Sequence, residues 1–198
     1  MKPFKEVSRG VDDVRRVFTL HSDVVRSQKS GAEFVVDRLD VPNWVNVVAV
    51  TDNDELILVK QWRFGERDFS LEVPAGLVDA GEDLQAAALR ELREETGYTP
   101  VADVQCLGDV APNPAFMNNR MTTYYVPCAK KTHSLDLDER EEIEVILMPL
   151  ADLDATLARG DFASALVWVA IFRFLRALDN DLVPRALKRL DRQKRDSS

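Results

Sequence analysis

One 23-residue segment, GLVDAGEDLQAAALRELREETGY, restricts what this chain can fold into more than any other part of it. Asp83 is a preferred N-cap residue, and Gly97 fits the left-handed position that commonly follows the last turn of a helix. These two signals predict a helix over residues 83–96. The helix is entered through a loop that begins at Gly76.

Three carboxylates gather on one face of this predicted helix. Glu91 and Glu95 are four residues apart, and Glu94 lies at the edge of the same face. Like charges at this spacing are mildly destabilising, so a purely structural helix gains nothing from them. Mg²⁺ and Mn²⁺ prefer carboxylate, carbonyl and water oxygens, so a bound cation of this kind would explain the cluster. The alternative is a solvated acidic face, which is what most glutamate-rich helices present.

The residues around the carboxylates favour the cation over the solvated face. Three consecutive alanines at 86–88 keep the helix slim, and two leucines form a separate apolar side that can anchor it to a sheet. Residues 74–76 form a turn whose backbone carbonyls can face the same cation. Glu82 and Arg90 are eight residues apart and can pair across the junction of loop and helix.

The rest of the chain predicts a mixed α+β protein. Strands are expected at 14–20, 33–39, 44–50, 55–62, 69–73, 103–110, 121–128 and 143–148. Helices are expected at 151–159, ended by Gly160, and at 162–178, which is apolar on most faces and therefore buried. We expect an N-terminal β element over residues 1–42 and one main domain over 43–198.

Composition excludes several classes of function. The net charge of −8 argues against a general nucleic-acid binder, which needs a basic surface, although a metal site can still attract an anionic small substrate. No apolar run reaches the roughly 18 residues that span a bilayer, and no signal-peptide stretch is evident. Cys106 and Cys128 form neither a disulfide framework nor a CxxC pair. We therefore expect a cytoplasmic protein with no nucleic-acid or membrane partner.

The 23-residue segment resembles the signature of the Nudix hydrolase family. The signature positions are supplied, in order, by Gly76, Glu82, Arg90, Glu91, Leu92, Glu94, Glu95 and Gly97. The one departure is Tyr98, which replaces an aliphatic residue at a packing position. The resemblance implies a Nudix fold, in which a mixed β-sheet lies between helices. It also implies a divalent-metal enzyme that cuts a nucleoside diphosphate linked to another group.

The flanking sequence is similar to the branch of the family that hydrolyses ADP-ribose and other nucleoside diphosphate sugars. This similarity rests on the runs LVKQWRFG and SLEVPAGLVDAGE and on Pro114 in PNPAFMNNR. It implies that Arg63 and Glu72 line the substrate site, together with Pro114, Phe116 and Asn118. Where the branch usually has Ser-Pro-Gly, this chain has Asn-Pro-Ala, so the base and the sugar of the substrate stay open. Three of the roles stay open as well, because Arg63 also suits a surface position, Glu72 an ion pair, and Asn118 a turn.

The resemblance also assigns roles in catalysis. The side chains of Glu91, Glu94 and Glu95 and the carbonyl of Ala75 would bind the metal, Mg²⁺ or alternatively Mn²⁺. The resemblance also implies that Arg90 and Glu94 are catalytic residues. Gly76, Glu82 and Gly97 are expected to be structural parts of the motif. The general base is expected in the loop after the sheet, at Glu139 or Glu141, where plain solvated acids are the alternative.

The same branch forms homodimers in which N-terminal strands reach the neighbouring subunit. Phe18, Phe34 and Trp44 are therefore candidates for stacking or interface residues, although residues of this kind are more often part of a core. Two competing functions remain. One is hydrolysis of dinucleoside polyphosphates or nucleoside triphosphates, and the other is a non-catalytic nucleotide sensor with the same fold.

Overall fold

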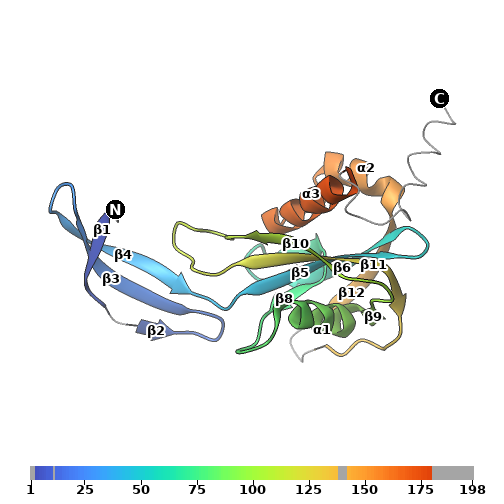
Figure 1. Ribbon diagram of the computed structural model, residues 1–198, viewed down its shortest axis with the longest axis horizontal. Helices are drawn as coiled ribbons and strands as arrows, with labels where there is room; N and C mark the ends of the chain where they lie inside the picture. Colours follow the sequence, from blue (N-terminus) through green and yellow to red (C-terminus); the bar gives the residue numbers. More distant parts are fainter. Residues whose placement is uncertain (1–2, 11, 138–141, 180–198) are drawn as a thin grey trace.

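The computed structural model describes residues 3–10, 12–137 and 142–179, and its strands form two separate sheets. Figure 1 shows the smaller, N-terminal sheet extending away from the body of the molecule. Strand β3 has β4 along one edge and β1 and β2 on the other, all antiparallel. The bounds of these strands are β1 Phe4–Ser8, β2 Asp12–Val14, β3 Thr19–Ser27 and β4 Glu33–Asp40.

The larger sheet has the order β10-β11-β5-β6-β12, with β7 paired to β6, β8 to β5 and β9 to β11. It is mixed, because β5 and β11 run parallel while the other pairs are antiparallel. Its strands are β5 Trp44–Thr51, β6 Glu55–Arg63, β7 Asp68–Glu72, β8 Ala75–Leu77, β9 Tyr98–Thr99, β10 Gln105–Val110, β11 Met121–Lys131 and β12 Ile143–Pro149.

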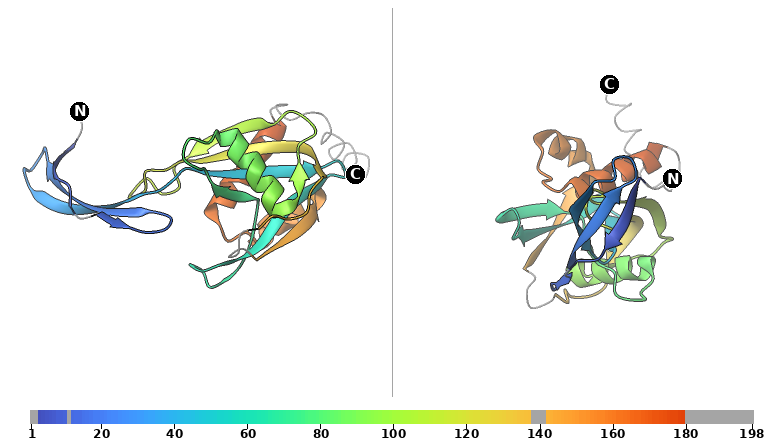
Figure 2. Two further views of the ribbon diagram at one scale, coloured as in Figure 1. Left: turned by 90° about the horizontal axis from the view of Figure 1, so that it is seen from below. Right: turned by 90° about the vertical axis from the view of Figure 1, so that its left-hand side faces the viewer.

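Helices cover both faces of the larger sheet (Figures 1 and 2). They are α1 Leu84–Thr96, the short 3₁₀ helix η1 Leu150–Asp152, α2 Leu153–Arg159 and α3 Ala165–Asp179. One buried cluster lies between the sheet and α1, and a second lies between the sheet and α3, where the tilted rings of Tyr125 and Phe174 pack with their centroids 5.2 Å apart. The predicted α+β architecture, with a mixed sheet between helices, is confirmed. None of the described helices is long and apolar enough to cross a membrane.

The alternation of residues along β5 explains how one strand serves both clusters. Val45, Val47 and Ala49 point to the α1 side, and Val48 and Val50 point to the α3 side. A strand buried on both faces reads as a continuous apolar run, as WVNVVAV does. The expected hairpin around residues 52–54 is present, since β5 and β6 pair at their adjoining ends.

The strand expected at residues 14–20 is wrong. The chain turns there, with the backbone N–H of Arg15 donating to the carbonyl of Phe18 at 2.8 Å, and β3 begins at Thr19. The apolar residues Val14, Val17 and Phe18 suggested a strand, but they belong to the end of β2 and to this turn.

The two sheets meet in a short polar junction. The side chain of Asn118 accepts from Val41 N–H at 3.0 Å and donates to Asp40 at 2.6 Å. Asn119 donates to the carbonyl of Pro42 at 3.0 Å, and Leu39 pairs with Met117 in an isolated bridge. The segment before β11 therefore holds the chain where it passes from one sheet to the other.

Candidate functional site

The direction of the glutamates of helix α1 is fixed by the caps of the helix and by its packing against the sheet. Asp83 caps the helix by accepting from two backbone N–H groups, at 2.9 and 3.0 Å, and Gly97 ends it at φ 77°. Ala87, Ala88 and Leu92 are fully buried against the sheet. The caps and the packing together fix the rotation of the helix, so the direction of its glutamates is fixed as well.

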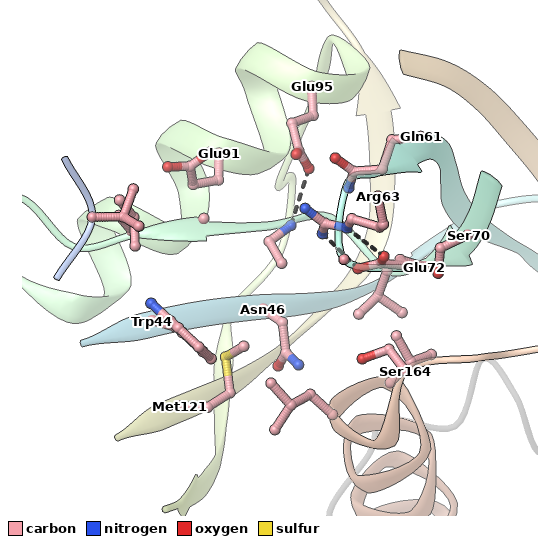
Figure 3. A pocket seen from close by; sticks show the side chains of 18 of the residues that line it. Trp44, Asn46, Gln61, Arg63, Ser70, Glu72, Glu91, Glu95, Met121 and Ser164 are labelled. Carbon is pink, nitrogen blue, oxygen red and sulfur yellow. Dashed lines mark hydrogen bonds and ion pairs between the residues drawn. The ribbon is translucent and has the colours of Figure 1, made fainter. Parts of the chain in front are cut away.

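Glu95 ties this helix to the loop that begins the motif. Its side chain is buried, with the residue 3% exposed, and one carboxylate oxygen accepts from the backbone N–H of Ala75 at 3.0 Å (Figure 3). The carbonyl of Pro74, one residue earlier, accepts from Val47 N–H at 2.9 Å. The turn at residues 74–76 is therefore held between strand β5 and the helix.

Gly76 lies directly under the carboxylate of Glu91. A Cβ atom at residue 76 would overlap the carboxylate carbon and both oxygens of Glu91. The glycine of the motif is therefore required by the close approach of a side chain, since its φ is not in the left-handed region.

Arg90 binds three of the carboxylates of the motif. It donates twice to Glu82, both at 2.9 Å, and its Nη1 donates to Glu91 at 2.7 Å and to Glu94 at 3.2 Å. Nη2 also donates to the carbonyl of Leu77 at 3.0 Å. These hydrogen bonds hold the pKa of the Glu82 carboxyl below its usual range and raise the pKa of Arg90. The predicted pairing of Glu82 with Arg90 across the loop is present.

Arg63 and Glu72, both predicted to line the substrate site, form an ion pair with each other. Two parallel hydrogen bonds of 2.7 Å join the guanidinium to the carboxylate, and Glu72 is buried while Arg63 is partly exposed. Bidentate pairs of this kind fix the plane of the guanidinium. An ion pair was the alternative to a substrate-site role for Glu72. Glu72 forms this ion pair and also lines the cavity.

A cavity of about 1220 Å³ lies beside these groups. It exists because β5 and β6 pair only at residues 49–50 with 56–57, after which β5 pairs with β8 and β6 with β7. The strands diverge, and the space between them opens toward the acidic face of α1 (Figure 3). The predicted residues that line it are Arg63, Glu72, Ala75, Gly76, Arg90, Glu91, Glu94 and Glu95.

The donor set along this wall consists of oxygen atoms, which suits a hard divalent cation. Within residues 3–10, 12–137 and 142–179, no three acidic, histidine or cysteine side chains are arranged as ligands of one ion. In this arrangement, Glu91 and Glu94 accept from Arg90, and Glu95 accepts from Ala75. Glu139 and Glu141 lie outside the described residues. The role of the three helix glutamates and of the Ala75 carbonyl as ligands stays a prediction.

The remaining predicted residues are divided between the cavity and the junction. Phe18 and Trp44 line the cavity, whereas Phe34 packs edge-on against Phe4 at 5.7 Å in the N-terminal sheet. Asn118 donates a hydrogen bond to Asp40 in the junction between the sheets. The residues that line the cavity do not include Asn118, Pro114 or Phe116. A role of these three in substrate binding stays a prediction.

Sequence reasoning missed two polar residues in the wall of the cavity, Asn46 and Gln61. Both are buried, and each has one polar atom that finds no hydrogen-bond partner within the part of the chain that the structure describes. A signal was present, because each interrupts an apolar strand, in WVNVVAV and in ELILVKQW. A buried polar residue inside such a run is expected to have a partner or a function.

Comparison with known proteins agrees with this geometry. Residues 42–168 match the NUDIX domain family. The Escherichia coli protein named ADP compounds hydrolase NudE is 31% identical over 159 residues, 79% of this chain and 83% of that protein. A Bacillus subtilis ADP-ribose pyrophosphatase is 35% identical over 112 residues, 56% of this chain, and the match spans only 60% of that relative's length.

A solved structure described as an ADP compounds hydrolase superposes with a TM-score of 0.81 at 27% sequence identity. The superposition covers 91% of this chain and 97% of the other. The similarity therefore includes the N-terminal sheet as well as the larger sheet and its helices.

Proposed function

The chain belongs to the Nudix family, and from this premise we propose that it hydrolyses the pyrophosphate of a nucleoside diphosphate sugar, releasing a nucleoside monophosphate and a sugar phosphate. The observation that carries the proposal is the shared cavity, which brings the acidic face of α1 and the Arg63–Glu72 pair to one space. The names of the E. coli and B. subtilis relatives make ADP-ribose the first compound to test.

In this proposal, Glu91, Glu94, Glu95 and the carbonyl of Ala75 would hold Mg²⁺, with Mn²⁺ as the alternative. A divalent cation in such a site neutralises phosphate charge and generates a stronger nucleophile from water. The fit rests on the oxygen donors and on the space over Gly76, which only a residue without a Cβ leaves for the Glu91 carboxylate. Arg90 keeps these carboxylates in place through its hydrogen bonds to Glu91 and Glu94.

Arg63 would bind the substrate phosphates. Its guanidinium is oriented by two hydrogen bonds to Glu72, and it lies in the wall of the cavity. A guanidinium whose plane is fixed in this way suits a planar contact to phosphate oxygens.

Water would attack one phosphorus, and the bridging P–O bond would break so that the two phosphomonoesters leave. The proton of the water would pass to Glu139 or Glu141, the acids predicted as the base. Changing the true base to glutamine should lower kcat by about 100-fold or more, with a smaller effect on KM. Glu142→Gln is the matched control, because Glu142 is the neighbouring acid, is exposed and directly precedes β12. If Glu139→Gln and Glu141→Gln each keep a kcat within a few-fold of the parent, the base is elsewhere.

A panel of substrates tests the function itself. ADP-ribose, GDP-mannose, UDP-glucose, a dinucleoside polyphosphate and a nucleoside triphosphate are each incubated with the protein and Mg²⁺, and the released phosphate esters are identified. We expect a nucleoside diphosphate sugar to be turned over fastest. Preference for a dinucleoside polyphosphate or a triphosphate would replace this proposal with the first competing function. No turnover of any compound would favour a nucleotide sensor.

We also propose that residues 1–42 form a dimerisation element attached to a Nudix domain over 43–198. Among the described residues of the N-terminal sheet, only Asp23 is buried, and Phe4, Phe34 and Val35 are exposed on a sheet that buries no apolar side chain. A sheet of this kind needs a covering surface for independent stability. A cytoplasmic location stays a prediction.

Light scattering should therefore give about twice the 22.4 kDa mass of the chain. Phe34 and Val35 are adjacent in β4 and so face opposite sides of the sheet. Phe34→Glu and Val35→Glu test these two faces separately, and the variant that yields monomer identifies the face that is covered. A monomeric parent at micromolar concentration would contradict the dimer.

A further inference from the structure

Gln61 is a buried polar residue in the wall of the cavity, and the Nudix motif does not include it. It lies on β6, four residues after Ile57, which belongs to the buried cluster under α1. The alternation of the strand therefore turns Gln61 to the same face of the sheet as Ile57. Figure 3 shows the side chain of Gln61 beside the carboxylate of Glu95 and the guanidinium of Arg63. The residue thus lies between the proposed cation site and the proposed phosphate contact.

The amide nitrogen of Gln61 is a donor with no hydrogen-bond partner among residues 3–10, 12–137 and 142–179. The residue is only 8% exposed, so bulk water does little to compensate this donor. An unpaired buried donor lowers the stability of a fold unless something binds to it. The donor is therefore either a defect of the fold or a contact for a ligand.

The neighbours of Gln61 explain why its donor stays unpaired. On β12 the residue directly opposite is Ile143, whose side chain has no polar atom. On β7 the residue directly opposite is Ser70, and the ion pair of Arg63 with Glu72 crosses over this Gln61–Ser70 pair diagonally. Each carboxylate oxygen of Glu72 already accepts from the guanidinium, and the guanidinium itself can only donate. The amide donor is thus left to the cavity.

The surroundings of the donor select the kind of atom that can bind to it. A donor requires an acceptor, and here the acceptor would lie between the guanidinium of Arg63 and the cation proposed at Glu95. The cation and the guanidinium both favour an anionic oxygen over the neutral acceptors of a nucleobase or a sugar. The non-bridging oxygens of a phosphate are anionic and accept hydrogen bonds. They are the atoms of the proposed substrate that suit this place.

We infer that Gln61 donates a hydrogen bond to a non-bridging oxygen of the pyrophosphate, beside the cation. This inference rests on the proposed function, because it assigns a further contact to the group that is cleaved. Strand β6 pairs with β7 on one side of Gln61 and with β12 on the other, so the backbone that carries the amide is fixed before the substrate binds. A donor held in advance stabilises the charge of the reacting oxygens without reorganisation.

Removal of the donor tests the contact in turnover. Gln61→Met keeps the length of the side chain and should lower kcat by about 100-fold, as expected for the loss of one donor to the reacting oxygens. The factor should be the same for each of ADP-ribose, GDP-mannose and UDP-glucose that the parent hydrolyses, because the pyrophosphate is common to them while base and sugar differ. Gln85→Met is the matched control, since Gln85 is an exposed residue of α1 outside the cavity. Losses that differ among the substrates would assign Gln61 to the base or the sugar and overturn the inference.

A second substitution tests the position of Gln61 without turnover. Gln61→Glu keeps the shape and adds a carboxylate beside Glu95, so it should tighten the binding of Mn²⁺, followed by electron paramagnetic resonance, by about tenfold. The same change should lower kcat, because a carboxylate repels a phosphate oxygen. Gln85→Glu adds the same charge away from the cavity and should leave the affinity for Mn²⁺ unchanged. Equal affinities in the parent and in Gln61→Glu would show that Gln61 is not beside the cation, and the inference would fail.

A third measurement separates this contact from a structural role. Methylenediphosphonate carries two linked phosphoryl groups without a base, a sugar or a cleavable bridge. Gln61→Met should weaken its binding to the Mn²⁺-loaded protein by about tenfold in a calorimetric titration. The melting temperature of the ligand-free variant should stay level or rise, because an unpaired buried donor is removed. Binding as tight as in the parent would contradict the contact, and a lower melting temperature would show that Gln61 serves the fold instead.

Failure of this inference and failure of the proposed function are distinguishable. If the parent hydrolyses none of the three compounds, the proposed function fails. The titrations with Mn²⁺ and with methylenediphosphonate still decide the role of Gln61, because neither depends on turnover.

Discussion

Replacing Gly76 with alanine should inactivate the protein without unfolding it. The added methyl group would overlap the carboxylate of Glu91, whereas ordinary van der Waals contact begins at 3.4 Å. The flexible carboxylate would have to move by more than about 1 Å, and a misplacement of this size in a catalytic group can cost about 100-fold in rate. That factor corresponds to about 2.7 kcal/mol of transition-state stabilisation.

The fold should tolerate the same change. Gly76 does not use a left-handed backbone conformation, and the overlapping atoms are at the end of a side chain, which can turn away. Gly65→Ala is the matched control, because a Cβ there meets nothing within 4 Å and the backbone is likewise compatible with alanine. Both variants should melt close to the parent, and only Gly76→Ala should lose activity.

A double substitution tests the cause. Glu91→Asp shortens the acid by one methylene, so it should reduce activity in the parent but add little further loss on top of Gly76→Ala. Two changes that act through the same carboxylate are not additive. Full activity in a folded Gly76→Ala protein, or strictly additive losses in the double variant, would refute the reasoning that Gly76 exists to make room for Glu91.

Three further predictions concern stability and the site. Gly97→Ala should lower the free energy of unfolding in urea by more than Gly160→Ala. Both residues have a left-handed φ, worth about 1–2 kcal/mol, but only at Gly97 would a Cβ also overlap a backbone carbonyl; equal losses would contradict this. Arg63→Ala should destabilise the fold by about 1–3 kcal/mol, because the buried Glu72 loses its partner, and an unchanged melting curve would show that the pair is not needed. Glu82 has a folded-state pKa below its ordinary value of 4.5, so its stabilisation is fully present above that pH and is lost as the pH falls through the lowered folded-state pKa. The difference in melting temperature between the parent and Glu82→Gln should therefore shrink in acid, and a constant difference would exclude the ion pair as its source.

The parts of the fold that local chemistry determines could be predicted from the sequence. Asp83 and Gly97 bound the helix as expected, because a cap and a left-handed glycine act within a few residues of the chain. The pairing of Glu82 with Arg90 was also predicted, since a loop and the first turns of a helix bring the two within reach. The spacing of the glutamates in the motif predicted that they share one side of the helix.

What depends on long-range contacts could not be predicted in the same way. The ion pair of Arg63 with Glu72 follows from the register of β6 and β7, and the open cleft follows from where β5 and β6 stop pairing. Asn46 and Gln61 stand out in the sequence as polar residues in apolar strands. Which of their atoms find no hydrogen-bond partner among the described residues depends on where β5 and β6 diverge in the folded chain. The misplaced strand at 14–20 has the same origin, because local apolar residues do not show where a chain turns.

The measurement that tests the central claim most directly is the binding of Mn²⁺, followed by its electron paramagnetic resonance signal, to the parent and to Glu95→Gln. Glutamine can still accept from the N–H of Ala75, so the loop and the fold should remain, and the melting temperature without metal should be close to that of the parent. We predict that Glu95→Gln weakens Mn²⁺ binding tenfold or more and abolishes hydrolysis of the nucleoside diphosphate sugar. A folded Glu95→Gln protein that binds Mn²⁺ as the parent does, and turns over substrate at a similar rate, would contradict the claim that the acidic face of α1 is the metal site.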